Sequence, residues 1–377
     1  MKTAQRTRLS LETLEDRSCP SLYLLFNGSD LNIGDGFLDG SPDSGILNIT
    51  QNAGSVSVAD GATSLGSYAV TGSVNVRLNN LAATVNLTLN APTTGDVNIS
   101  AGNGGDTVNV TGAGNQIGGN LKISTGAGND SVTINGTPVA GSLIVNLAAG
   151  SDSLTVETGS SVGGNLLANG VNFFLLGDTV AVGGQLNLNA SSEIQSNTYF
   201  FNGIVGGPTS TIGGGLVITT SGGFSDLVDL QSTVAGNVTA NLGSGGNTFT
   251  VNSSALIHGG VTVIGKGGTD NVTLASDAVI LGNVNVLLGN GANSLEINST
   301  ILGRSIMYLG GSGADVLTFG VDATATGALL NARLGAGVDS FTLNSNRLRR
   351  GFIDFGFGAD IFASSVTVNF PLTLRNK

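Results

Sequence analysis

The sequence of 377 residues contains 60 glycines, no tryptophan and only 10% charged residues, while 40% of it is apolar. Its formal net charge is −11, and the segment 18–303 holds seventeen acidic residues but only three basic ones, Arg77, Lys122 and Lys266. A long acidic body repels nucleic acids and anionic membranes, which argues against both as partners. The apolar content is too high for a disordered Gly/Ser linker, so a packed β protein is predicted.

The first predicted unit is an N-terminal segment, residues 1–20. Its stretch RLSLETLEDRSCP, residues 8–20, resembles the N-terminal LExLEDRxxP motif of secreted and surface proteins of planctomycetal bacteria, where the motif is regarded as a sorting signal. The motif's usual proline is Thr13 here. The resemblance implies an extracellular or cell-surface location. The alternative is a short amphipathic helix that Pro20 ends. The matching residues are Leu11, Glu12, Leu14, Glu15, Asp16, Arg17 and Pro20.

Membrane insertion and an internal disulfide are not expected. No apolar run reaches the length of a membrane span, and Cys19 is the only cysteine. Residues 21–71 follow as an N-terminal cap with irregular first coils, because a regular repeat begins only at Gly72. The ends of a stacked β structure need covering, which makes residues 366–377 the matching C-terminal cap strand.

Residues 72–365 carry a repeat of about 23 residues. A first column of glycines recurs every 20 to 24 residues, apart from one step of 30 that contains an insertion at 189–210. A second column of Asp or Asn stands about eleven residues further on in each repeat. The first column comprises Gly72, Gly95, Gly119, Gly141, Gly164, Gly184, Gly214, Gly236, Gly260, Gly282, Gly303, Gly327 and Gly351. The second comprises Asp106, Asp130, Asp152, Asn172, Asn197, Asp226, Asn247, Asp270, Asn293, Asp315, Asp339 and Asp360.

Each repeat contains two short strands and a brief third one. Apolar residues alternate with polar ones after both columns, as in Leu121 and Ile123 or Val132 and Ile134, and this period of two marks strands with one buried face. No helical pattern occurs after Pro20. The prediction is an all-β, single-stranded parallel β-helix of roughly 13–14 coils, with a coil length similar to that of pectate-lyase-type β-helices.

The Asp column is the candidate metal site. GGSGADVLTF, residues 310–319, resembles the GGxGxDxLx turn of RTX calcium-binding β-rolls, which implies Ca²⁺ at stacked turns. RTX motifs repeat every nine residues, whereas one motif per coil occurs here. The alternative is a plain ladder of Asp and Asn, because these residues and glycine also suit tight turns without any metal. The candidate ligands are the consecutive acids Asp106, Asp130, Asp152, Asp315, Asp339 and Asp360.

Catalytic signals are weak. His258 is the only histidine, so neither a histidine metal cluster nor a Ser/His/Asp triad is expected. The insertion 189–210, with Glu193 and Tyr199, is the one place where a polysaccharide-degrading cleft is expected.

A second ladder of stacked amides is expected beside the glycines. An arginine group near the last coils is interpreted as a solvated end cap rather than an anion site. The amide ladder comprises Asn120, Asn165, Gln185, Asn237 and Asn283, and the arginines are Arg347, Arg349 and Arg350.

These observations favour a non-catalytic extracellular or cell-surface β-solenoid, a scaffold or adhesin-like protein, with calcium as its only candidate cofactor. Expected partners are envelope or extracellular polysaccharides, or other surface proteins, with neither nucleic acid nor membrane insertion. The alternative is a β-helix that binds or degrades polysaccharides.

Overall fold

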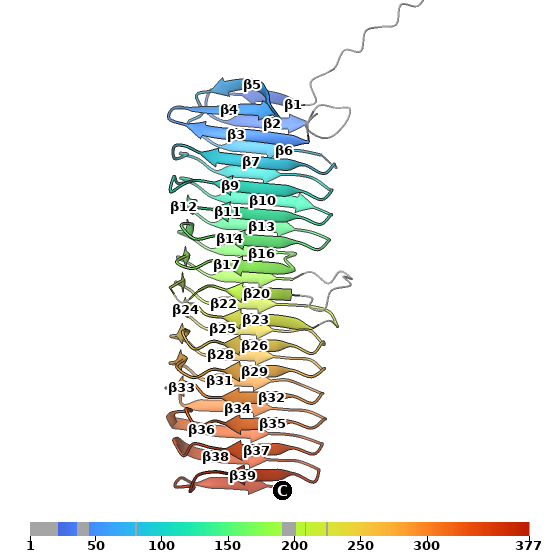
Figure 1. Ribbon diagram of the computed structural model, residues 1–377, viewed down its shortest axis with the longest axis vertical. Helices are drawn as coiled ribbons and strands as arrows, with labels where there is room; N and C mark the ends of the chain where they lie inside the picture. Colours follow the sequence, from blue (N-terminus) through green and yellow to red (C-terminus); the bar gives the residue numbers. More distant parts are fainter. Residues whose placement is uncertain are drawn as a thin grey trace, which may run out of the picture.

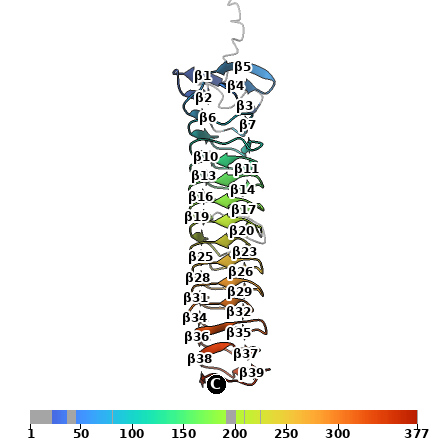
Figure 2. The same ribbon diagram turned by 90° about the vertical axis from the view of Figure 1, so that its left-hand side faces the viewer.

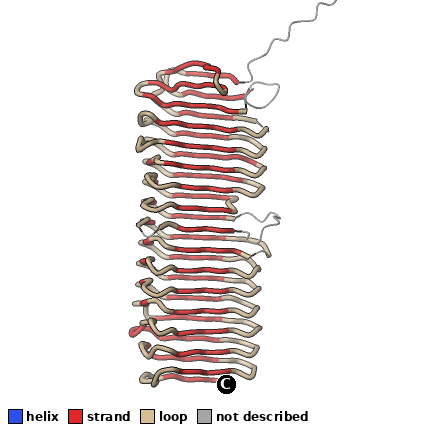
Figure 3. The backbone as a smooth tube through the Cα atoms, in the orientation of Figure 1, coloured by secondary structure: helices blue, strands red, loops and turns tan. Residues whose placement is uncertain are grey.

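The structure is a computed structural model that describes residues 22–35, 45–79, 81–190, 201–207, 209–223 and 225–376. All regular elements in these ranges are β-strands, wound into one long rod (Figures 1 and 3). No helix that could cross a membrane occurs in the described ranges. The N-terminal segment, with its sorting-type motif, lies outside them, as do Glu193 and Tyr199 of the insertion.

Three sheets run along the rod, and neighbours within each sheet come from successive coils. In spatial order, sheet 1 consists of β1 (Leu22–Phe26), β2 (Leu31–Asp35), β6 (Val74–Arg77), β8 (Val97–Ser100), β10 (Leu121–Gly126), β13 (Leu143–Leu147), β16 (Leu166–Asn169), β19 (Leu186–Asn189), β22 (Leu216–Thr219), β25 (Val238–Asn241), β28 (Val261–Ile264), β31 (Val284–Leu287), β34 (Ser305–Leu309), β36 (Ala325–Arg333), β38 (Leu348–Asp354) and β40 (Leu372–Arg375).

Sheet 2 faces sheet 1 across the core. From the C-terminal end it consists of β39 (Ile361–Ser364), β37 (Ser340–Leu343), β35 (Val316–Phe319), β32 (Ser294–Ile297), β29 (Asn271–Leu274), β26 (Thr248–Val251), β23 (Asp226–Leu230), β20 (Phe201–Val205), β17 (Phe173–Leu176), β14 (Ser153–Val156), β11 (Ser131–Asn135), β9 (Thr107–Thr111), β7 (Thr84–Leu89), β3 (Ile46–Asn52), β4 (Ser55–Asp60) and β5 (Thr63–Tyr68).

Sheet 3 closes one narrow edge of the rod with two-residue strands. It consists of β12 (Pro138–Val139), β15 (Ser161–Val162), β18 (Ala181–Val182), β21 (Thr211–Ile212), β24 (Thr233–Val234), β27 (Leu256–Ile257), β30 (Val279–Ile280) and β33 (Thr300–Ile301). One coil thus passes through sheets 1, 2 and 3 in turn, as β13, β14 and β15 do. The parallel β-helix with about 23 residues per coil is confirmed, and in the described chain the thirteen sheet 1 strands from β6 to β38 bound twelve complete turns.

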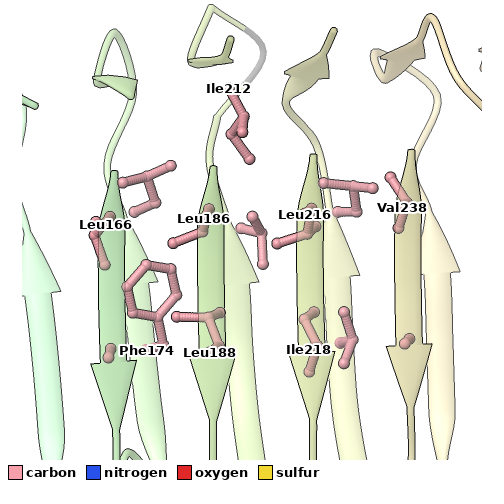
Figure 4. Close-up of a cluster of buried hydrophobic side chains, with 14 of the residues drawn as sticks. Leu166, Phe174, Leu186, Leu188, Ile212, Leu216, Ile218 and Val238 are labelled. Carbon is pink, nitrogen blue, oxygen red and sulfur yellow. The ribbon is translucent and has the colours of Figure 1, made fainter. Parts of the chain in front are cut away.

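The core is a stack of identical positions. Leu166, Leu186, Leu216 and Val238 pair in register along sheet 1, and all four are fully buried (Figure 4). Phe174 from sheet 2 is also fully buried and lies level with Leu188 and Ile218 in the adjoining row of the core (Figure 4). Each such side chain contributes about 1.5–3 kcal/mol on burial, and one-residue slippage would turn it outward. The alternating pattern therefore determines the register of every coil.

The two ends of the rod are built differently (Figures 1 and 2). At the N-terminal end β1 pairs antiparallel with β2, and β3, β4 and β5 form an antiparallel set. At the other end the outermost strands, β39 and β40, continue the parallel order. The N-terminal hairpins thus fold back over the first coils and use the hydrogen-bonding edge that a parallel stack would leave open.

Two details of the predicted columns were wrong. The register of β20 places Phe201 between Asn172 and Asp226, at the position predicted for Asn197, which itself lies outside the described residues. The glycine column ends at Gly303: Gly351 lies inside β38 and pairs with Leu330. In these last coils β36 and β38 are each long enough to take the place of the third strand of one coil and the first strand of the next. The turn between those two strands, which needs glycine in the earlier coils, is therefore lost.

Candidate functional site

The Asp and Asn column lies inside the rod, at the turn from sheet 1 to sheet 2. Each residue directly precedes or begins a sheet 2 strand, and the described members from Asp106 to Asp339 other than Asn172 are at most 2% exposed. The sequence places acids at this turn, but it does not show that they point inward. We call this set the inner ladder; it comprises Asp106, Asp130, Asp152, Asn172, Asp226, Asn247, Asp270, Asn293, Asp315, Asp339 and Asp360.

Side-chain oxygens of the inner ladder accept backbone N–H groups from the preceding coil. The N–H of Asp106 donates to Oδ1 of Asp130 at 2.8 Å, and the N–H of Asp130 donates to Oδ1 of Asp152 at 2.9 Å. The same bond recurs at the other end, where the N–H of Asp339 donates to Oδ1 of Asp360 at 2.8 Å. Because a parallel ladder leaves turn N–H groups without a strand partner, these side chains satisfy donors that would otherwise be buried alone.

Asn and Asp differ at the second side-chain atom. Asn247 and Asn293 donate from Nδ2 to the carbonyl oxygen four residues earlier, Gly243 at 3.1 Å and Gly289 at 3.0 Å. A carboxylate cannot donate in this way. The Oδ2 atoms of Asp106, Asp270 and Asp339 are buried with no hydrogen-bond partner among the described residues.

Burial raises the pKa of several of these acids. The pKa of Asp106 and of Asp270 rises to about 6, because the charged form loses water and lies near Asp130 and Asp226 respectively, although hydrogen bonds from Ala83 and Asn247 partly offset this. Burial also raises the pKa of Asp315 and Asp339. The protonated acid gains a donor, so it can imitate the neighbouring asparagines.

Glycines make room for this arrangement. A Cβ on Gly265 or Gly310 would overlap Oδ2 of Asp270 or Asp315. At Gly128, where φ is +145°, a Cβ would strike the carbonyl oxygen of Gly104 in the preceding coil. Glycine is therefore required at this turn for close stacking as well as for chain reversal.

The inner ladder does not fit a calcium site of the RTX kind. Ca²⁺ takes six to eight oxygen ligands, but here one oxygen of each bonded carboxylate already accepts an N–H and the acids follow in single file, one per coil. The described residues contain no group of three or more His, Cys, Asp or Glu side chains that could hold a metal. Asp106, Asp130, Asp152, Asp315, Asp339 and Asp360 each accept a backbone N–H, the arrangement that the alternative interpretation, a ladder of Asp and Asn, describes.

Tyr308 adds a buried hydroxyl to the same interior. It is fully buried in β34, in register with Val286 and Ala332, and its hydroxyl has no hydrogen-bond partner among the described residues. Burial, together with Asp315 and Asp339 nearby, raises its pKa. Tyr308 therefore remains neutral, and its side chain contributes to packing in the core.

The predicted amide ladder beside the glycines is present, but its bonds differ from those expected. Oδ1 of Asn120 accepts the N–H of Ser142 at 2.9 Å, and Oδ1 of Asn237 accepts the N–H of Gly260 at 2.8 Å. These side chains accept N–H groups from the following coil, whereas the side chains of the inner ladder accept N–H groups from the preceding coil. Amide-to-amide stacks occur instead on the outer faces, where Nδ2 of Asn169 donates to Oδ1 of Asn146 at 2.7 Å.

The outer face of sheet 1 carries two hollows that the sequence did not indicate. One, of about 380 Å³, lies at the N-terminal end below Tyr23. The other, of about 440 Å³, has a floor of Gly259, Gly260 and Gly282 with Thr262 and Asn285 beside it. Both form because successive coils place short side chains or glycines in line.

The remaining candidates are scattered. Arg347, Arg349 and Arg350 are exposed at the last coils, where Nη1 of Arg347 donates to Oγ1 of Thr324 at 3.1 Å. His258 directly follows β27 of sheet 3 and belongs to no group of three or more His, Cys, Asp or Glu side chains in the described part of the chain. No family model, no curated protein and no solved structure matches this chain. Its class is therefore defined by the fold alone: a β-solenoid.

Proposed function

We propose that this chain is a non-catalytic scaffold, outside the cell or on its surface, that contributes to an envelope, matrix or adhesive layer. The observation that carries the proposal is the inner ladder. Its acids and amides, the residues most able to do chemistry, accept backbone N–H groups from coil to coil and so stabilise a straight stack. Sixteen strands in sheet 1, about 4.8 Å apart, make a rod about 70 Å long.

Acids on the outer faces also support a structural role. Asp229 and Glu296 occupy the same outward column of sheet 2, but Thr250 and Thr273 separate them. Three strand steps put them about 14 Å apart along the rod. A glycosidase pair requires about 5–9.5 Å, so Asp229 and Glu296 are spaced too widely to act together as such a pair. The extracellular location rests on the resemblance of residues 8–20 to a sorting motif.

The location is tested by protease shaving of intact cells that express the chain naturally. We expect a surface-displayed chain to be cleaved, and a variant with residues 8–20 scrambled to remain protected inside. Protection of the unaltered chain would contradict the proposed location.

The absence of catalysis is tested separately by incubating the purified chain with a panel of acidic and neutral polysaccharides. We expect neither reducing ends nor unsaturated sugars to accumulate. Release of either product by the chain, lost in Asp229→Asn or Glu296→Gln, would replace the scaffold with the enzyme alternative.

A further inference from the structure

The hollow below Tyr23 has a defined architecture, which we call the Tyr23 groove. Two outward rows of side chains run along sheet 1 here. One row passes from Arg77 through Ser100 and Ser124 to Asn146. The serines are short, whereas the side chains at both ends are longer, so a trough of about 380 Å³ opens between them.

The second row forms one wall of the groove. Nδ2 of Asn75 donates to Oδ1 of Asn32 at 3.0 Å, and Nδ2 of Asn98 donates to Oδ1 of Asn75 at 2.8 Å. Lys122 and Ile144 continue the row. The wall therefore presents an amide at each of three coils and then a cation, all held in register by the strands beneath.

Tyr23 closes the N-terminal end of the groove. It is the antiparallel partner of Gly34, and a Cβ on Gly34 would lie 2.5 Å from the tyrosine ring. The ring consequently rests on bare backbone, while half of its surface remains exposed. An aromatic ring held in this way offers a flat apolar surface beside polar groups, the combination typical of small-molecule pockets.

The charge of the groove is opposite to that of the rod. Arg77 and Lys122 are two of the three basic residues in the segment 18–303, and both are exposed and line the groove. None of its described lining residues is acidic. Arg77 and Lys122 lie two strand steps apart, about 10 Å along the rod. Such sparse positive charge suits a polymer with spaced carboxylates better than a nucleic acid, whose dense charge the acidic body repels.

We propose that the Tyr23 groove binds a linear acidic polysaccharide lying along the rod axis. Arg77 and Lys122 bind its carboxylates, the serine hydroxyls and asparagine amides bind its hydroxyls, and the Tyr23 ring packs on a sugar ring. This adds a ligand to the proposed scaffold, and it does not depend on where the chain is displayed.

The test is isothermal titration of the whole chain with hexamers of galacturonate, mannuronate and guluronate, alongside the fully methyl-esterified galacturonate hexamer. We expect at least one acidic hexamer to bind. If galacturonate binds, its methyl ester, which keeps the backbone but not the charge, should bind at least about tenfold more weakly. Arg77→Gln and Lys122→Gln should each weaken binding of the acidic ligand by roughly tenfold, because a hydrogen bond to a charged group is lost.

Two further variants keep the result specific to the groove. Lys266→Gln removes the third basic residue of the segment 18–303. Lys266 does not line the groove, so this variant should bind as the unaltered chain does. Ser124→Tyr fills the trough without removing a charge and should abolish binding, with circular dichroism confirming an intact β-helix. Equal binding of acid and ester, full binding by Ser124→Tyr, or no binding of any acidic hexamer would each overturn the proposal. A scaffold that binds no polysaccharide would still give the expected results in the polysaccharide-panel and shaving experiments. Failure of the ligand proposal can therefore be distinguished from failure of the scaffold proposal.

Discussion

Polar residues repeat along this rod both inside the turn between sheets 1 and 2 and on the outer face of sheet 1. Inside, Asp130 accepts a backbone N–H through Oδ1 and the hydroxyl of Thr125 through Oδ2, at 2.8 and 2.5 Å. Outside, Asn169 exchanges hydrogen bonds with the equivalent asparagines of neighbouring coils. Inner residues have no access to water as a substitute partner, whereas outer ones do. An inner hydrogen bond is therefore expected to contribute more to the free energy of unfolding than an outer one.

The largest expected effect comes from removing an inner side chain. Asp130→Ala leaves the N–H of Asp106 and the hydroxyl of Thr125 buried without a partner, and should lower the free energy of unfolding by about 3 kcal/mol. Asp130→Asn retains the Oδ1 acceptor and should lose less than about 1 kcal/mol. Urea denaturation measures both, and hydrogen exchange at the Asp106 amide reports the site directly. Equal stability of the alanine variant and the unaltered chain would contradict the structural role.

A smaller effect is expected from pH. The folded-state pKa of about 6 for Asp106 and Asp270 lies above the usual 3.8, so the folded chain binds more protons than the unfolded chain between these values. This stabilisation is fully present below about pH 4 and is lost as pH rises through about 6. We expect the chain to melt at a higher temperature at pH 4.5 than at pH 7.5, with each group contributing about 1–2 kcal/mol.

Asp270→Asn provides the matched variant for this pH dependence. Its Oδ1 still accepts from Asn247, and its Nδ2 can donate to the carbonyl of Lys266, four residues earlier, as Asn247 and Asn293 do. We expect this variant to be more stable than the unaltered chain at pH 7.5 and less dependent on pH. A melting temperature that rises steadily from pH 4.5 to 7.5 in the unaltered chain would contradict the raised pKa.

An outer amide should matter less. Asn169→Ala removes two side-chain hydrogen bonds on a half-exposed surface, where water can replace them, and should cost about 0.5–1 kcal/mol in urea denaturation. A loss as large as that of Asp130→Ala would show that the outer stacks are also essential to the rod.

No effect is expected from calcium on the inner ladder. Because its bonded oxygens already accept N–H groups, the melting temperature should be the same in millimolar Ca²⁺ and in chelator. A rise in Ca²⁺ that Asp315→Asn or Asp339→Asn abolishes would restore the calcium interpretation.

Much of the fold could be predicted because the repeat is local. Val132 and Ile134 alternate with polar residues in one strand, and equivalent pairs recur about 23 residues later, so the strands, their buried faces and their parallel register follow from the pattern. The groove could not be predicted in the same way. Arg77 and Lys122 do fall at outward positions of their repeats, which was a usable signal, but Tyr23 precedes the first repeat and no period relates it to them.

The sequence by itself determined the parallel β-helix, its coil length and the position of the acids at one turn, because side-chain alternation and glycine spacing are local properties. Only the tertiary structure decided that those acids point inward, since this depends on how the turn closes against the next coil. It also decided that β1 folds back to set Tyr23 over Gly34, near Arg77 on the neighbouring strand β6 and Lys122 on β10. Both depend on how neighbouring strands and turns pack against one another in space, which a one-dimensional pattern does not record.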